Sequence, residues 1–202
     1  MRFFLLDTLG DTNDEDLCFL SNFVKGIEAK SWCVYRGEPL APFYPEDAKI
    51  FLARGDKGVK LSSMIGNDQR MLVVSSEFTG LIEKHCKRSE IEILPFTLYD
   101  HRKRVLSKDY FLINPLGTFD CLDFKKSDIT WDEDEPGEVV RIRDYVVDKK
   151  KAKKAPQLFR FHKDSSTYVV GVELAEDMYE HDLTNVAWKR LRFSGEPREE
   201  DE

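Results

Sequence analysis

Residues 110–131 read YFLINPLGTFDCLDFKKSDITW, and the fold is organised around this stretch. It opens with an apolar run that is too short for a helix and rich in strand-forming residues, which predicts a buried strand. Asn114-Pro115 ends that strand, because proline cannot donate a hydrogen bond to a sheet. Gly117 allows a turn, and a second apolar patch follows, formed by Phe119, Cys121, Leu122 and Phe124. The stretch lacks the spacing of a catalytic site, so we expect function on the surface around it.

A helix and a β-hairpin are predicted before this stretch. Phe78, Leu81 and Ile82 share one face of a helix expected over residues 76–86, with serine as its N-cap. Residues 91–99 are strand-like, although a proline within them favours a sheet edge or a bulge. The polar turn DHRKR at residues 100–104 leads into the strand at Tyr110, which predicts a hairpin.

Short elements are expected in the remaining thirds of the chain. At the N-terminal end we predict strands over residues 2–6, 31–35 and 48–52 and an amphipathic helix within residues 17–27. After the central stretch we predict strands over residues 139–147, 158–161 and 168–172, a helix over residues 174–183 and a closing segment over residues 187–193. Arg160 is expected on the solvent face of its strand or paired with a carboxylate.

Runs of strands with separated helices indicate an α+β fold, with a mostly antiparallel sheet and a few short helices packed on it. We divide the chain into an N-terminal α/β extension over residues 1–65, a main α+β domain over residues 66–193 on which it packs, and a charged, disordered tail over residues 194–202.

The composition of the chain indicates which classes of binding partner suit it. The chain has 202 residues, 41% of them hydrophobic, and a net charge of −7. A negative balance disfavours nucleic acid as the main partner, since phosphate binding needs a surplus of Lys and Arg, and it suits a basic partner.

The cysteines and the N-terminus indicate a reducing compartment. Cys18, Cys33, Cys86 and Cys121 are far apart, without C-x-x-C or zinc spacing, which predicts buried free thiols. The apolar run after Arg2 is too short for a signal peptide, and no stretch approaches the ~20 apolar residues that span a bilayer. We therefore expect a cytoplasmic protein that does not enter a membrane.

Five short motifs in order carry a family resemblance. They are YFLIN at residues 110–114, Asp123-x-x-x-Ser127, LFRF at residues 158–161, the helix near residues 174–182, and LTNVAW at residues 183–188. Over about residues 70 to 193 the chain resembles immunity-protein family eleven of bacterial polymorphic toxin systems. Asn185 stands where the family tends to have glycine, and asparagine also adopts left-handed geometry. The resemblance implies a cytoplasmic protein that binds and neutralises a cognate toxin domain, without enzymatic activity of its own. We also expect no cofactor and no metal.

Two acidic clusters are candidates for toxin binding. The first comprises Asp132, Glu133, Asp134, Glu135 and Glu138, and the second Asp11, Asp14, Glu15 and Asp16. Each is either a solvated loop or a surface whose carboxylates meet a basic toxin face, such as a nuclease groove. Trp131, beside the first cluster, is either the aromatic anchor of that interface or a core residue.

Two other functions stay open. One is an enzyme of unrecognised hydrolase type that uses Asp123 with a histidine, although His85, His101, His162 and His181 stand in no catalytic motif. In a structural role, Asp123 would pair with Ser127 or bind neighbouring backbone amides. The other is a nucleic-acid-binding regulator that uses the basic run from Lys149 to Lys154, which lacks interleaved aromatic residues.

Overall fold

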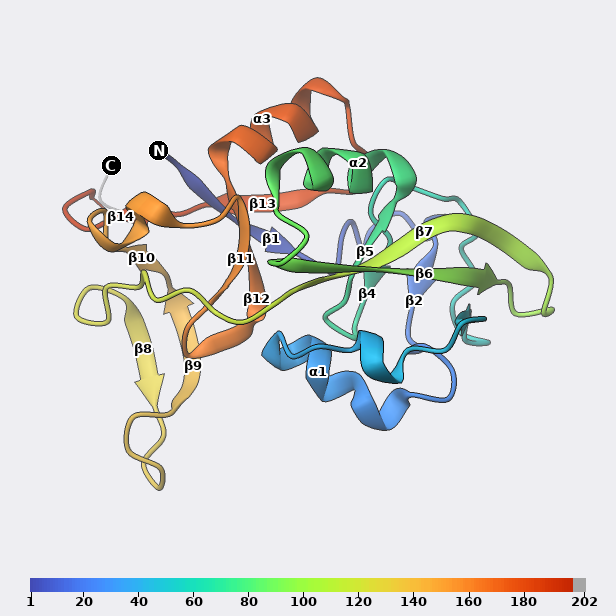
Figure 1. Cartoon of the computed structure of the whole chain (residues 1–202), viewed down its shortest axis with the longest axis horizontal. Helices are drawn as coiled ribbons and strands as arrows, with labels where there is room; N and C mark the ends of the chain where they lie inside the picture. The colour runs from blue at the N-terminus through green and yellow to red at the C-terminus, as the bar shows by residue number, and fades with distance from the viewer. Residues whose placement is uncertain (198–202) are drawn as a thin grey trace.

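The computed structural model describes residues 1–197, and two four-stranded sheets form its frame (Figure 1). The first sheet is antiparallel throughout, in the order β11 (Leu158–Phe161), β12 (Asp164–Gly171), β1 (Phe3–Asp7) and β13 (Ala187–Arg190). The second has the order β3 (Lys49–Phe51), β6 (Ile91–Tyr99), β7 (Val105–Pro115) and β5 (Leu72–Ser75), and within it only β3 and β6 are parallel. The predicted α+β class with mostly antiparallel pairing is confirmed.

Smaller elements complete the described chain. Three strand pairs accompany the sheets: β2 (Phe19–Leu20) with β4 (Gly66–Asn67), β8 (Asp128–Trp131) with β9 (Val139–Asp144), and β10 (Val146–Val147) with β14 (Arg192–Phe193). The α-helices are α1 (Ser31–Arg36), α2 (Ser76–His85) and α3 (Val172–Glu180), and the 3-10 helices are η1 (Glu28–Lys30), η2 (Ala41–Phe43) and η3 (Lys151–Lys154). In Figure 1, α1 and α2 lie on opposite faces of the β6–β7 pair.

The central stretch reaches all three hydrophobic cores. Along β7, Leu112 enters the core that contains α1, whereas Ile113 enters the core that contains α2 and α3, because successive strand residues face opposite sides. Past the turn at Gly117, which has a φ of 68°, Cys121 and Leu122 are buried in a third core against the first sheet. The segment around β7 therefore joins the two sheets, and its central place in the fold agrees with the prediction from the sequence.

Helix α2 matches its prediction closely. The Ser75 hydroxyl accepts a hydrogen bond from the Phe78 amide at 3.3 Å and so caps the helix. At the other end, His85 Nε2 and Lys84 Nζ lie 2.7 and 2.6 Å from the same carboxylate oxygen of Asp177 on α3. These contacts fix α2 beside α3. The hairpin of β6 and β7 and that of β11 and β12 are likewise confirmed.

Two N-terminal predictions are wrong. Residues 17–27 do not form a helix, because their backbone bonds to other segments: the amide of Cys18 donates to Lys60 at 2.8 Å, and that of Lys25 to Lys49 at 2.8 Å. Residues 31–35, expected as a strand, belong to α1. That helix ends at Gly37, which has a φ of 67° and whose carbonyl accepts the Gly117 amide at 2.8 Å. Cys33 and Val34 are both buried in this helix.

Residues 1–7 and the C-terminal segment both pair with the rest of the fold. β1 lies between β12 and β13. After β14, the amide of Ser194 donates to Val147 at 3.0 Å, so the chain is still bonded at the start of the predicted tail. Residues 198–202, the remainder of that predicted tail, lie outside the described residues.

Arg160 is fully buried, which contradicts its expected place on the solvent face or beside a carboxylate. Its guanidinium donates to backbone carbonyls and neutral side chains, at 2.7–3.2 Å. The acceptors are the carbonyls of Pro115 and Ser165, Asn114 Oδ1 and the hydroxyl of Tyr168, whose ring lies 4.2 Å from the Arg160 Cζ atom. The sequence did not predict this burial, because the acceptors on Pro115 and Asn114 lie 45 and 46 residues away from Arg160.

Asn114 extends the same network into the N-terminal half. Its Nδ2 donates to the Glu38 carbonyl and to Glu92 Oε2, each at 2.9 Å. Glu92 in turn accepts from the amides of Leu40 and Ala41 at 2.9 and 3.0 Å. One continuous set of hydrogen bonds therefore connects β11 of the first sheet to β6, β7 and the segment after α1.

We expect Arg160→Met to destabilise the protein by about 3 kcal/mol, because it leaves several buried acceptors without donors. Urea unfolding followed by tryptophan fluorescence measures the loss. Arg143→Met, on the exposed part of β9, is the matched control and is expected to change stability by less than about 0.5 kcal/mol. Equal stabilities of the two variants would contradict the structural role of the network.

Candidate interaction surface

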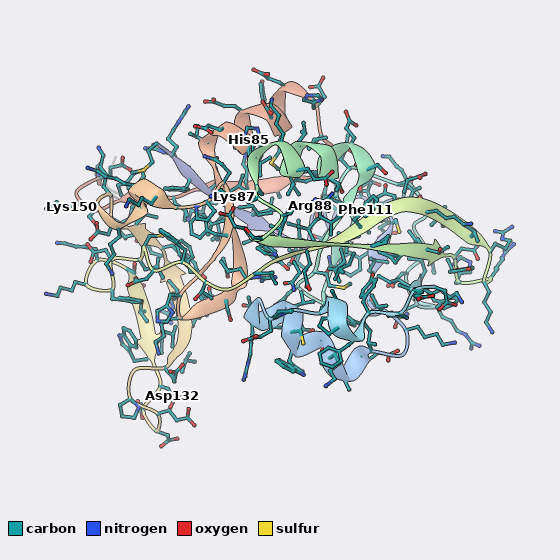
Figure 2. All side chains as sticks on the ribbon, viewed as in Figure 1. His85, Lys87, Arg88, Phe111, Asp132 and Lys150 are labelled. Carbon is teal, nitrogen blue, oxygen red and sulfur yellow. The ribbon has the colours of Figure 1, made fainter. Side chains whose placement is uncertain are left out.

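The β8–β9 hairpin with its connecting loop, residues 128–144, forms an arm that projects from the sheets (Figures 1 and 2). Its strands pair from Asp128 opposite Asp144 to Trp131 opposite Val139. Asp132, labelled in Figure 2, stands near the far end. The first predicted acidic cluster is therefore the tip of an arm that a partner can reach from several sides.

Within the tip, one carboxylate organises the loop and the others remain exposed. Asp132 Oδ1 accepts the amides of Asp134 and Glu135 at 2.8 and 2.9 Å. The Glu135 amide first, and then that of Asp134, lower the pKa of Asp132. Glu133, Asp134 and Glu135 present their side chains to solvent, whereas Glu138 forms an ion pair with Lys163 at 2.7 Å.

Trp131 is half-exposed, so the alternative in which it is a core residue is wrong, and its role as an aromatic anchor stays a prediction. Its side chain is 42% accessible, and its ring lies 5.9 Å from that of Phe124. Because Phe124 packs against the third core, it supports one side of the indole. The other side stays available to a partner, directly beside the acidic tip.

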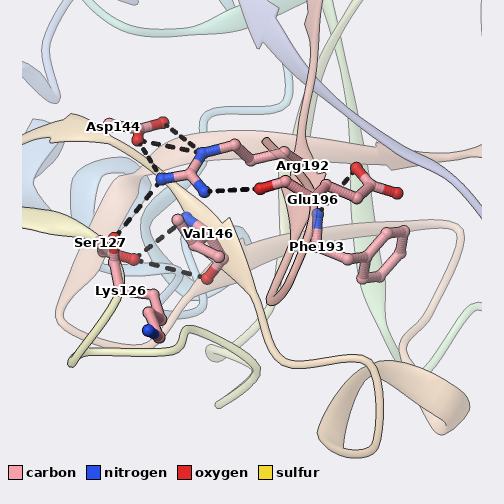
Figure 3. Close-up of polar contacts among 7 residues, drawn as sticks. All are labelled: Lys126, Ser127, Asp144, Val146, Arg192, Phe193 and Glu196. Carbon is pink, nitrogen blue, oxygen red and sulfur yellow. Dashed lines mark hydrogen bonds and ion pairs between the residues drawn. The ribbon is translucent and has the colours of Figure 1, made fainter. Parts of the chain in front are cut away.

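Polar contacts hold the base of the arm to the C-terminal strand (Figure 3). Arg192 Nε donates to Asp144 Oδ2 at 3.1 Å. The Ser127 hydroxyl, at the start of the arm, accepts the Val146 amide at 3.0 Å. The chain on both sides of the arm is therefore fixed, and the hairpin between these contacts is the part that extends outwards.

The second acidic cluster lines a separate cavity of about 470 Å³, to which Asp11, Asp14 and Glu15 contribute. Asp14 pairs with Lys60 Nζ at 3.0 Å, and this hydrogen bond lowers the pKa of its carboxyl. Asn185 Oδ1 accepts the Asp11 amide at 2.6 Å, which anchors the loop. Asn185 has a φ of 59°, so the predicted left-handed geometry is confirmed.

A larger groove, of about 720 Å³, lies between the arm and the first sheet. It is lined by residues 139–142 of β9, by the ends of β1 and β13, and by the start of β12. Leu9 lines both this groove and the smaller cavity, and its side chain is 44% exposed. The sequence did not predict the groove, because its lining comes from five separate segments of the chain, between residues 5 and 189.

The structure places Asp123 in a turn. Its carboxylate accepts the Ser194 hydroxyl at 2.7 Å and the Lys125 amide at 3.1 Å. Ser194 first, and then the amide of Lys125, lower its pKa. Ser127 meets it only through the backbone, its amide donating to the Asp123 carbonyl at 2.9 Å. Of the two structural readings, the one in which Asp123 binds a neighbouring backbone amide is confirmed.

The histidines contact other groups. Among residues 1–197, His85 bonds to Asp177 and His181 lies 3.6 Å from Glu77, and no hydrogen bond joins a histidine to Asp123. Within the same residues, no three His, Cys, Asp or Glu side chains are placed to hold a metal ion. All four cysteines are buried free thiols, as predicted, and burial raises the pKa of Cys121 to about 12.

The basic run forms a short turn on the surface. Asp148 Oδ1 accepts the Lys150 and Lys151 amides at 2.8 and 3.1 Å, and Ala152 is buried. The ammonium of Lys151 is occupied by Asp120, 3.0 Å from both carboxylate oxygens. The run therefore combines exposed lysines, such as Lys150 in Figure 2, with one that is used within the chain.

An α+β frame that presents an acidic arm fits the class of proteins that work by binding another protein. The sequence matches the model of the immunity protein family Imm11 over residues 25–192, so the chain belongs to that family. The match starts well before residue 70, where the resemblance in the sequence begins, and thus includes α1 and β3. No match is found among curated proteins. In the described chain, no helix has both the length and the apolar character needed to cross a membrane.

We expect Asp123→Asn to destabilise the protein at pH 7, because it weakens bonds to Ser194 and Lys125. Since folding lowers the pKa of Asp123, the charged carboxylate stabilises the fold above the unfolded value of about 4, and this contribution is lost as the pH falls through the folded value. The difference in unfolding free energy from the parent should therefore shrink below about pH 4. Urea denaturation across pH 2–7 measures it, with the exposed Asp128→Asn as control; a gap that stays constant to pH 2 would refute the assignment.

Proposed function

We propose that this chain is an immunity protein that binds a cognate bacterial toxin domain, for example a nuclease. It neutralises the toxin in the cytoplasm by stoichiometric occlusion. Membership of the immunity family is the observation that carries this proposal. The net charge of −7 supports a basic partner. Under this proposal residues 1–65 are an extension packed on residues 66–193, and they supply the second acidic cluster.

The arm is our first candidate for the contact. Its tip carries exposed Glu133, Asp134 and Glu135, and the half-exposed Trp131 lies beside them. Charges on a protruding loop steer a basic partner during approach, and a supported aromatic side chain provides the desolvated contact that slows release. The cluster of Asp11, Asp14, Glu15 and Asp16 is the second candidate, although the ion pair of Asp14 with Lys60 leaves it fewer free charges.

A binding role also agrees with how the candidate catalytic groups are used. Asp123 holds a turn, and His85 holds α2 to α3. These contacts support the proposal that the chain acts by binding and without catalytic activity.

The direct test is co-expression with the product of the adjacent upstream gene. We expect the two chains to copurify as a complex and expect the neighbouring product to be toxic to cells that lack this protein. A neighbouring product that neither binds nor poisons such cells would count against an immunity function.

Charge reversal at the tip should slow association. Changing Asp132, Glu133, Asp134 and Glu135 to Lys is expected to lower the association rate constant about tenfold at low salt, with a smaller effect near 0.5 M salt, where charges are screened. Biolayer interferometry against the immobilised toxin measures this. A matched control reverses four exposed acidic residues outside the arm, namely Glu46, Asp109, Glu173 and Glu180. If both quadruple variants associate equally fast, overall charge and not the arm controls the encounter.

Trp131→Ala should weaken toxin binding by about 2 kcal/mol, the loss typical of an interfacial aromatic anchor, and change stability by less than about 1 kcal/mol. Trp32 on α1 is a close control, since each of the two indoles is 42% exposed. We expect Trp32→Ala to leave affinity unchanged in isothermal titration calorimetry. Equal affinities of the two alanine variants would remove Trp131 from the interface.

A further inference from the structure

The groove beside the arm is bounded by strands on two sides. Residues 139–142 of β9 line it from the arm, and residues 187–189 of β13 line it from the first sheet. With a volume of about 720 Å³, it is far larger than a space for a single side chain. Any occupant therefore contacts the arm and the frame at the same time.

The acidic side chains of the groove are already bonded within the chain. Asp164 accepts hydrogen bonds from the Tyr145 hydroxyl at 2.5 Å and from Thr167 Oγ1 at 2.8 Å. Asp7 accepts one from the Leu9 amide at 2.9 Å, and Asp68 accepts one from Gln69 Nε2 at 2.8 Å. These donors are neutral, so the three carboxylates keep their negative charge, but the bonds hold them in place on the wall of the groove.

Two of the four basic side chains in the groove have no such partner. The other two are bonded within the chain: Lys163 pairs with Glu138 at 2.7 Å, and Arg70 donates to the Ser166 hydroxyl at 3.0 Å. Arg141 on β9 and Lys189 on β13 are exposed, and neither forms an ion pair or side-chain hydrogen bond with a described residue. The two walls thus each present one free positive charge, beside an arm whose tip is strongly negative.

Both walls are also edge strands. β9 has only β8 as a neighbour, and β13 has only β1, among the described strands. The Leu191 amide donates to the Phe3 carbonyl at 2.9 Å, so by the alternation of an antiparallel ladder the amides of Trp188 and Arg190 point away from β1. Of these two residues Trp188 lines the groove, and its free backbone amide favours an occupant with extended backbone, as in strand addition.

Building on the proposed immunity function, we propose that the groove receives an extended acidic segment of the toxin. Its carboxylates pair with Arg141 and Lys189, and its backbone lies along β9 and β13. The complete interface then has two contacts of opposite sign: the tip meets a basic toxin surface, and the groove holds an acidic strand. A basic protein without that acidic segment meets only the tip, which makes the groove the source of selectivity.

The test compares two double variants of equal charge change. Arg141→Glu with Lys189→Glu places repulsion in the groove, whereas Arg102→Glu with Lys108→Glu alters exposed cations outside both the groove and the arm. We expect the groove variant to raise the dissociation rate constant of the toxin complex at least tenfold and the control variant to leave it unchanged within twofold. Biolayer interferometry with the immobilised toxin gives both rates. Arg141→Gln with Lys189→Gln, which removes charge without repulsion, should fall between them.

The outcomes separate the two proposals. If the parent protein does not bind the toxin, both the immunity function and the groove contact are wrong. If parent and groove variant dissociate at the same rate, only the groove contact is wrong. Binding of a fluorescein-labelled single-stranded 20-nucleotide DNA that is lost in the groove variant would instead assign the groove to nucleic acid and overturn the proposal.

Hydrogen–deuterium exchange provides a second readout on unaltered protein. In the toxin complex we expect slower exchange in β9 and β13, and at the Trp188 and Arg190 amides in particular. Protection restricted to the arm tip would contradict an occupant that lies along the groove.

Discussion

The burial of the Arg160 guanidinium is the constraint on which the arrangement of the two sheets depends. A buried cation is costly unless its hydrogen-bonding groups are satisfied, and here carbonyls and neutral side chains from β7 and β12 surround it. The acceptors at Asn114 and Pro115 exist only where β7 ends, so β11 has one favourable position against that end. Because Asn114 also bonds to Glu92, a shift of the first sheet would disrupt contacts in the second.

The position of the arm follows from this frame. Downstream of the Asn114-Pro115 end of β7, Cys121 and Leu122 enter the third core, and the arm begins a few residues later. Arg192 and Ser127 then fix its base. The frame thus keeps the exposed tip, Trp131 and the groove in a constant relation to each other. When a partner binds all three, this protein loses little conformational entropy. Pre-organisation of that kind raises affinity without adding contacts.

Local pattern predicted a large part of the fold. Helix α2, the β6–β7 hairpin and the β11–β12 hairpin were all recognisable, because their periodicity, caps and turns lie within a few neighbouring residues. The acidic tip was also visible in the sequence. Two of the errors have a common cause: residues 17–27 bond to segments that are distant in sequence, and the partners of Arg160 on β7 are 45 and 46 residues away. The groove could not be predicted for the same reason, since Arg141 and Lys189 line one groove only after both strands are in place.

The central claim is that this protein acts by occupying its target and not by converting it. Titration of the purified toxin at a fixed concentration well above the dissociation constant tests this most directly. We predict that toxin activity falls linearly, reaches zero at one equivalent of this protein, and does not change with the time of preincubation. Complete, time-dependent loss of toxin activity at a small fraction of an equivalent would show turnover and contradict the account.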